Sequence, residues 1–100
     1  MFIEFDKDYL RELFEQGRTS DKKHRYQPEV IKGYQKAVAS LKRAINVEML
    51  YRLNSLNYEK KAIISVRINQ QYRLEFTVRD VMNEQIITVC RLLDISNHYK

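Results

Sequence analysis

The sequence predicts an α+β fold: an N-terminal strand, two helices, and then a three- to four-stranded antiparallel sheet. Apolar residues recur with a helical period in the first half of the chain and with a period of two in the second half. The chain has 100 residues, of which only two are glycine and one is proline. This length holds one domain, residues 1–100, and so few turn formers argue against a many-stranded all-β fold.

Residues 2–5 form the first expected strand, and a short helix follows it. Asp6 or Asp8 can cap the start of this helix through a side-chain oxygen. Gly17 stands where a helix C-cap belongs, because glycine adopts the left-handed conformation without strain. The apolar positions of the expected helix are Tyr9, Leu10, Leu13 and Phe14.

A polar loop over residues 18–27 precedes the second helix and carries three basic residues, Lys22, Lys23 and Arg25. Pro28 suits the first turn of a helix, where its missing N–H costs nothing. The helix is expected to run to about residues 44–46. Its apolar seam, at spacings of three and four, consists of Ile31, Tyr34, Val38, Leu41 and Ile45.

The period then changes from 3.6 to two. Residues 64–68 and 72–78 alternate apolar with polar side chains, as half-buried strands do. Residues 80–84 have the composition of a turn, and residues 85–93 are apolar on both faces, as in a covered strand. Cys90 lies in this last strand and is expected to be an inert core residue.

The pairing register of the expected hairpin follows from its apolar pattern, because a slip of one residue would expose a whole apolar set. A three-residue loop, 69–71, pairs Val66 with Leu74 and therefore Arg67 with Arg73. This loop lacks the glycine that such turns often use.

Like charges that face each other across two strands are destabilising, so the Arg67–Arg73 pair needs a reason. A bound anion would supply one, because guanidinium groups match phosphate oxygens with two parallel hydrogen bonds. The alternative is an ordinary polar face on which Glu75 neutralises one arginine. The pattern alone leaves both interpretations open.

The net charge of +5 is unevenly distributed. Between residues 22 and 79 there are thirteen basic and four acidic residues, whereas the two ends together are acidic. A basic middle favours a polyanionic partner, nucleic acid first, and the alternative is a solvated lysine-rich surface. With no signal peptide and no apolar run of about 20 residues, we expect a cytoplasmic protein without membrane contact.

The sequence contains no pattern typical of a metal or cofactor site. His24 and His98 have no partners at metal-ligand spacing, so neither a metal site nor a cofactor is expected. His24 lies in the basic loop and is expected to be solvated. His98 belongs to a polar cluster after the last strand and can reach the arginine face if that strand neighbours it.

The stretch 64–76, which reads ISVRINQQYRLEF, resembles the S-I/V-R-I/V-N-x-Q-Y/W-R-I/L-x-F hairpin of the HigB branch of RelE-type bacterial toxins. Residues 13–18 resemble the end of that family's first helix, and residues 97–99 its C-terminal motif. Length and element order also agree, so the resemblance covers the whole chain. It implies a RelE-like microbial RNase-type fold.

The resemblance also implies a function: the toxin of a type II toxin–antitoxin system, which cuts mRNA in the ribosomal A site. Arg67 and Arg73 match arginines that hold the scissile phosphate, and His98 matches a catalytic histidine. Lys60 and Lys61 would hold the RNA backbone, together with Lys22, Lys23 and Arg25. The implied partner is a HigA-like antitoxin with a helix-turn-helix DNA-binding domain.

The tail departs from the family pattern, since Ser96-Asn97-His98 replaces Asp-Tyr-His. A second general acid or base is thus absent or is replaced by Tyr99, Tyr58 or a lysine. Two alternatives to the nuclease follow. One is a non-catalytic toxin that binds a protein such as gyrase, as the ParE branch does. The other is an inactive relative that acts only with its antitoxin.

Overall fold

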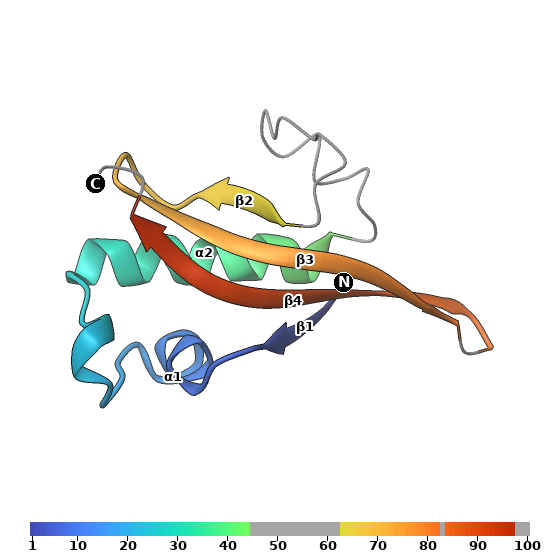
Figure 1. The fold of residues 1–100 in the computed structure, drawn as a ribbon, viewed down its shortest axis with the longest axis horizontal. Coiled ribbons are helices and arrows are strands. Elements are labelled where there is room, and N and C mark those ends of the chain that lie inside the picture. The colour runs from blue at the N-terminus through green and yellow to red at the C-terminus, as the bar shows by residue number, and fades with distance from the viewer. Residues whose placement is uncertain (45–62, 83, 98–100) are drawn as a thin grey trace.

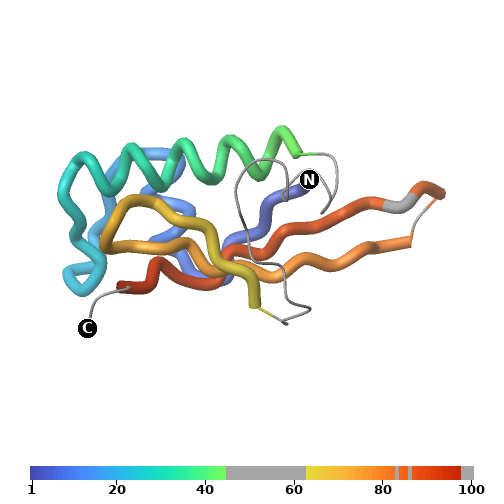
Figure 2. Tube along the Cα trace, turned by 90° about the horizontal axis from the view of Figure 1, so that it is seen from above, coloured from blue at the N-terminus to red at the C-terminus, as the bar shows by residue number. Residues whose placement is uncertain are grey.

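A computed structural model describes residues 1–44, 63–82 and 84–97 of the chain. Two helices cover one face of a four-stranded sheet whose strand order is β1-β4-β3-β2 (Figures 1 and 2). The α+β fold expected from the sequence is confirmed. The elements are β1 (Phe2–Phe5), α1 (Asp8–Gln16), α2 (Pro28–Arg43), β2 (Ile64–Arg67), β3 (Tyr72–Met82) and β4 (Ile86–Asn97).

Helix α1 ends as predicted but begins differently. The backbone of Gly17 is left-handed, with φ of 73°, and its N–H donates to the carbonyl of Leu13 at 3.1 Å. The expected aspartate cap is wrong, because Lys7 is the N-cap residue and makes no side-chain cap. Asp6 instead accepts hydrogen bonds from Arg91 of β4. A long-range ion pair has therefore replaced the local cap.

Helix α2 begins as predicted, with Pro28 in its first turn. Of the expected seam, Tyr34, Val38 and Leu41 are buried, Ile31 is only half-buried, and Ile45 lies outside the described residues. Gly33 lies where the helix crosses the β2–β3 turn, and a Cβ atom there would lie 2.9 Å from Cγ2 and 3.0 Å from the carbonyl oxygen of Ile68. The glycine therefore permits the close approach of helix and hairpin. The buried residues of α2 are Val30, Tyr34, Val38 and Leu41.

The sheet is mixed, and the expectation of a purely antiparallel sheet is wrong. Strands β2, β3 and β4 are antiparallel to one another, but β1 pairs in parallel with β4, from Phe2 opposite Val89 to Phe5 opposite Leu92. Parallel neighbours need a long connection. Here the two helices and the β2–β3 hairpin all lie between the paired strands in the sequence.

The turn expected over residues 80–84 is correct only in part: residues 80–82 belong to β3, which continues to Met82, whereas Glu84 lies in a bend before β4 begins at Ile86. Asp80 accepts a hydrogen bond from the hydroxyl of Thr88 at 2.9 Å, so this polar residue is part of the ladder. The two strands project beyond the helices as an arm (Figure 1), on which Val81 and Met82 are exposed.

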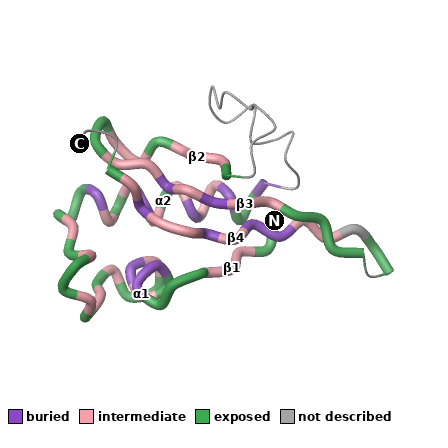
Figure 3. Tube along the Cα trace, viewed as in Figure 1, coloured by how far each residue is buried: buried purple, intermediate pink, exposed green. Residues whose placement is uncertain are grey.

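The core lies between the helices and the sheet (Figure 3). Leu10 and Leu13 of α1 and Tyr34 of α2 pack there with Phe76 and Leu92 of the central strands. Cys90 is fully buried among them, and burial raises the pKa of its thiol to about 12, as expected of an inert residue. Among the described residues, no helix is long and apolar enough to span a bilayer.

Candidate nucleic-acid interface

The hairpin has the register that the sequence predicted. Val66 lies opposite Leu74, and Arg67 lies directly opposite Arg73. The N–H groups of Ile68 and Asn69 both donate to the carbonyl of Tyr72, at 2.9 and 3.3 Å, and close the loop over residues 69–71.

Asn69 explains how this loop forms without glycine. Its side-chain oxygen accepts hydrogen bonds from the N–H groups of Gln71 at 2.9 Å and Tyr72 at 2.7 Å. Such a side-chain turn imitates a backbone turn. Across the described residues, no residue other than glycine has a positive φ. The arginine pair thus stands at the end of a hairpin whose turn is held by a side chain.

Within the described residues, no carboxylate lies in ion-pair distance of the Arg67 or Arg73 guanidinium. Glu75 pairs in register with Ser65 and contacts neither arginine as an ion pair. Ser96 of β4 lies on the other side of Arg73. Among the described residues, the pair therefore offers two guanidinium groups without a carboxylate partner, next to Ser65 and Ser96. Leu74 is fully buried toward the helices, so Arg73 lies on the opposite face of the sheet, which the helices leave uncovered (Figure 2).

The arginines farther along the same face are neutralised. Glu4 of β1 lies 2.8 Å from Arg79 and 3.1 Å from Arg91, and Arg91 also lies 2.8 Å from Asp6. The hydrogen bonds from Arg79 and then Arg91 hold the pKa of Glu4 below its ordinary value. The sequence analysis missed this network, because its partners are far apart in the chain.

The basic loop lies at the same end of the molecule as the arginine hairpin (Figure 1). Lys22 and Lys23 belong to a short 3-10 helix, η1 (Lys22–His24), and both are exposed, as is Arg25. The next residue, Tyr26, packs edge-on against Tyr72, the first residue of β3, with ring centroids 5.3 Å apart. The loop that carries these three cations therefore contacts the first residue of β3 through a tyrosine pair.

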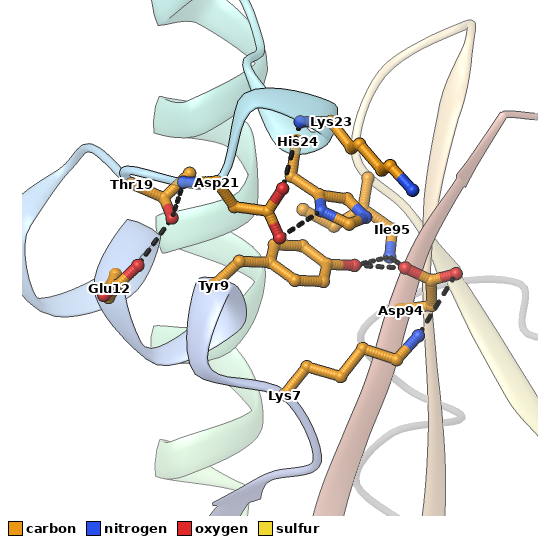
Figure 4. A network of polar contacts seen from close by, with 9 residues as sticks. All are labelled: Lys7, Tyr9, Glu12, Thr19, Asp21, Lys23, His24, Asp94 and Ile95. Atoms are coloured by element: carbon orange, nitrogen blue, oxygen red, sulfur yellow. Dashed lines mark hydrogen bonds and ion pairs between the residues drawn. The ribbon is translucent and has the colours of Figure 1, made fainter.

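The expectation that His24 is solvated is wrong. Its ring stacks on Tyr9 of α1, with centroids 3.6 Å apart and planes 6° apart (Figure 4). Its Nδ1 atom lies 3.0 Å from Asp21, an ion pair when the imidazole is protonated, although the contact is not a well-aligned hydrogen bond. The basic loop is therefore held to α1 by an aromatic stack.

An open polar recess of about 480 Å³ lies between the start of α2 and the hairpin turn. Its lining is rich in carboxamides, which both donate and accept hydrogen bonds. The lining residues are Gln27, Glu29, Asn69, Gln70 and Gln71.

Four of the sequence-predicted site residues, Lys60, Lys61, His98 and Tyr99, lie outside the described residues, as does Tyr58. Asn97 is the last described residue and pairs with Tyr72 beside the hairpin turn. In the described ranges, no three His, Cys, Asp or Glu side chains gather where they could hold a metal ion.

Two further contributors escaped the sequence analysis. Gly33 sets the distance between α2 and the hairpin, and a glycine inside a helical pattern was the available signal. Asp94, two residues before Ser96 in β4, accepts a hydrogen bond from Tyr9, and no local pattern marks that contact.

Comparisons with protein-family models, with curated proteins and with solved structures found no match for this chain.

Proposed function

We propose that this protein is the toxin of a type II toxin–antitoxin system that cuts mRNA on the ribosome. The observation that carries the proposal is the uncompensated Arg67–Arg73 pair, which opposes two cations without a counter-ion among the described residues. Such an arrangement costs stability until an anion binds. The resemblance of the hairpin sequence to the HigB pattern supports the scissile phosphate of RNA as this anion.

In this mechanism the ribose 2′-OH attacks the adjacent phosphorus, and the 5′-oxygen leaves. Arg67 and Arg73 stabilise the charge that grows on the phosphate oxygens in the transition state. His98 exchanges a proton with the attacking or leaving oxygen, and Tyr99 assists it. Lys22, Lys23, Arg25, Lys60 and Lys61 bind the RNA backbone. The reaction needs no metal.

The biological setting follows from the same proposal. The protein acts in the cytoplasm, where translating ribosomes present mRNA in the A site. A HigA-like antitoxin with a helix-turn-helix domain silences it. The basic surface favours an acidic segment in that partner.

The test is translation in a purified cell-free system, with primer extension on the mRNA. We expect cuts that require ribosomes and that disappear with Arg73→Ala. Arg79→Ala is the matched control, because it removes the same charge from the same strand and face, at a residue neutralised by Glu4.

Each other outcome has a clear meaning. Cuts that persist with Arg73→Ala would remove this arginine from the site. Blocked translation without cuts would indicate a ribosome-binding protein. An absence of any effect on translation would favour the gyrase-binding alternative or an inactive relative.

A further inference from the structure

Strand β4 contains a β-bulge just before it reaches the arginine pair. Between Thr77 opposite Arg91 and Phe76 opposite Leu92 the register is regular, but the next pair is Glu75 with Asp94. Leu93 is thus the extra residue. A bulge of this kind re-aims every side chain that follows it.

The consequence falls on the arginine face. With the bulge, Ile95 lies opposite Leu74 and is 6% exposed, and Ser96 lies opposite Arg73. Without it, the regular register would place Asp94 opposite Leu74, in the core, and Ile95 opposite Arg73. The bulge therefore decides whether a serine or an isoleucine stands beside the proposed phosphate site.

Contacts from α1 hold the bulge in place (Figure 4). The hydroxyl of Tyr9 donates to Oδ1 of Asp94. The N–H of Ile95 donates to the Tyr9 oxygen at 3.2 Å and to Oδ1 of Asp94 at 3.0 Å. Lys7 adds an ion pair with Asp94 at 3.8 Å, exposed to solvent and therefore weak.

Tyr9 itself cannot move easily. It is 3% exposed, and its ring is packed against the His24 ring. Burial, and then the hydrogen bond with Asp94, raise the pKa of Tyr9. Its hydroxyl therefore stays protonated, and remains a hydrogen-bond donor, at neutral pH. A buried donor on α1 therefore points at Asp94, the residue that follows the bulge.

We propose that Tyr9 and Asp94 form a register lock that keeps Ser96, and not Ile95, beside Arg73. The carboxylate excludes the regular register, because that register would bury an unpaired charge against Leu74. In the bulged register, the Tyr9 hydroxyl forms hydrogen bonds with the Asp94 carboxylate and the Ile95 N–H. Tyr9 and Asp94 are positioning residues, and their importance for RNA rests on the proposed function of the arginine pair.

The main test is Asp94→Leu, which makes the regular register acceptable because leucine can enter the core. NMR spectra of the full chain should show residue 95, instead of residue 96, as the cross-strand neighbour of Arg73. Affinity for a labelled single-stranded RNA should fall about tenfold or more, as expected when a charge-assisted contact is lost. Asp94→Asn still accepts the Tyr9 hydrogen bond and should keep both the register and the RNA affinity.

A second pair of variants covers the case in which Asp94→Leu does not fold. Tyr9→Phe removes the hydroxyl at the bulge, and Tyr34→Phe removes another buried hydroxyl, which donates to the carbonyl of Leu10 at 2.7 Å. Hydrogen exchange at Ile95 and Ser96 should accelerate in Tyr9→Phe and not in Tyr34→Phe, once both are compared at equal global stability.

The outcomes separate the lock from the proposed function. An Asp94→Leu protein that still pairs residue 96 with Arg73 would overturn the lock. So would equal exchange at Ile95 in the two tyrosine variants. If the register moves in Asp94→Leu but Arg73→Ala binds RNA as tightly as the parent chain, the lock stands and the phosphate site fails.

Discussion

Two pairs of arginines lie on the sheet face opposite the two described helices and differ in their ion-pair partners. Arg79 and Arg91 share Glu4, and Arg91 also binds Asp6, so their charges are matched by the first strand and the residue after it. Arg67 and Arg73 oppose each other without such a partner among the described residues. Arg79 and Arg91 thus belong to a structural ion-pair network that joins β1 to the rest of the sheet. The Arg67–Arg73 pair lacks such partners among the described residues, as is expected of a ligand site.

The largest expected effect is a difference in RNA affinity between two double variants, each of which removes one arginine pair. Arg67→Ala with Arg73→Ala and Arg79→Ala with Arg91→Ala each remove two positive charges, so long-range electrostatics change equally. We expect RNA affinity to fall at least about 100-fold in the first double variant, since it loses two charge-assisted contacts worth about 1.5–3 kcal/mol each. In the second it should fall about threefold at most.

Fluorescence anisotropy at several salt concentrations measures this difference. Equal losses in the two double variants would mean that the whole basic surface binds RNA diffusely, and the contrast between the two pairs would disappear.

The next effect concerns the placement of the hairpin that carries Arg67 and Arg73. Gly33→Ala would press a Cβ atom onto Ile68, 2.9 Å from a methyl group and 3.0 Å from a backbone oxygen. Overpacking costs about 1–3 kcal/mol, and the better helix propensity of alanine returns at most about 1 kcal/mol. We expect a net loss of about 1–2 kcal/mol in urea unfolding.

Ala39→Gly in the same helix calibrates the propensity contribution, which should be destabilising there. If the Gly33→Ala protein were more stable than the parent chain, the hairpin would be able to shift away from the new Cβ atom at little energetic cost.

The smallest effect is the acid response of the paired region. The pKa of Glu4 is held below its ordinary value of 4.5 by Arg79 and then Arg91. The stabilisation from this carboxylate is therefore complete above pH 4.5 and is lost as the pH falls through the lowered pKa.

Glu4→Gln should lower Tm near neutral pH and flatten the decline of Tm between pH 6 and pH 3. Glu75→Gln, on the same face but without an ion pair among the described residues, serves as the control and should leave the profile as it is. Identical profiles for the two variants would assign the acid response to other groups.

The sequence predicted what depends on local periodicity. The burial of Tyr34, Val38 and Leu41 in α2 and the Arg67–Arg73 register follow from spacing, because spacing along the chain sets the face on which each side chain lies. The three-residue loop 69–71 was predicted correctly although it contains no glycine, because the apolar pattern of the two strands fixes the register more strongly than the loop's preference for glycine.

What escaped prediction depends on contacts between distant segments. The parallel pairing of β1 with β4 and the stacking of His24 on Tyr9 produce no periodic pattern in the sequence. The bulge at Leu93 is similar: residues 85–93 read as one apolar strand, and the extra residue has meaning only once Tyr9 lies beside Asp94.

The strand order also has a kinetic consequence. Strand β4 comes after all the other described strands in the chain, yet it lies in the middle of the sheet and is the only partner of β1 among them. Contacts such as Asp6 with Arg91 close a loop of 85 residues, at an entropic cost of about 4 kcal/mol. Before β4 arrives, β2 and β3 form an isolated hairpin, which is marginally stable in water. During synthesis at about 5–20 residues per second, the arginine face therefore stays unassembled until the last strand has emerged.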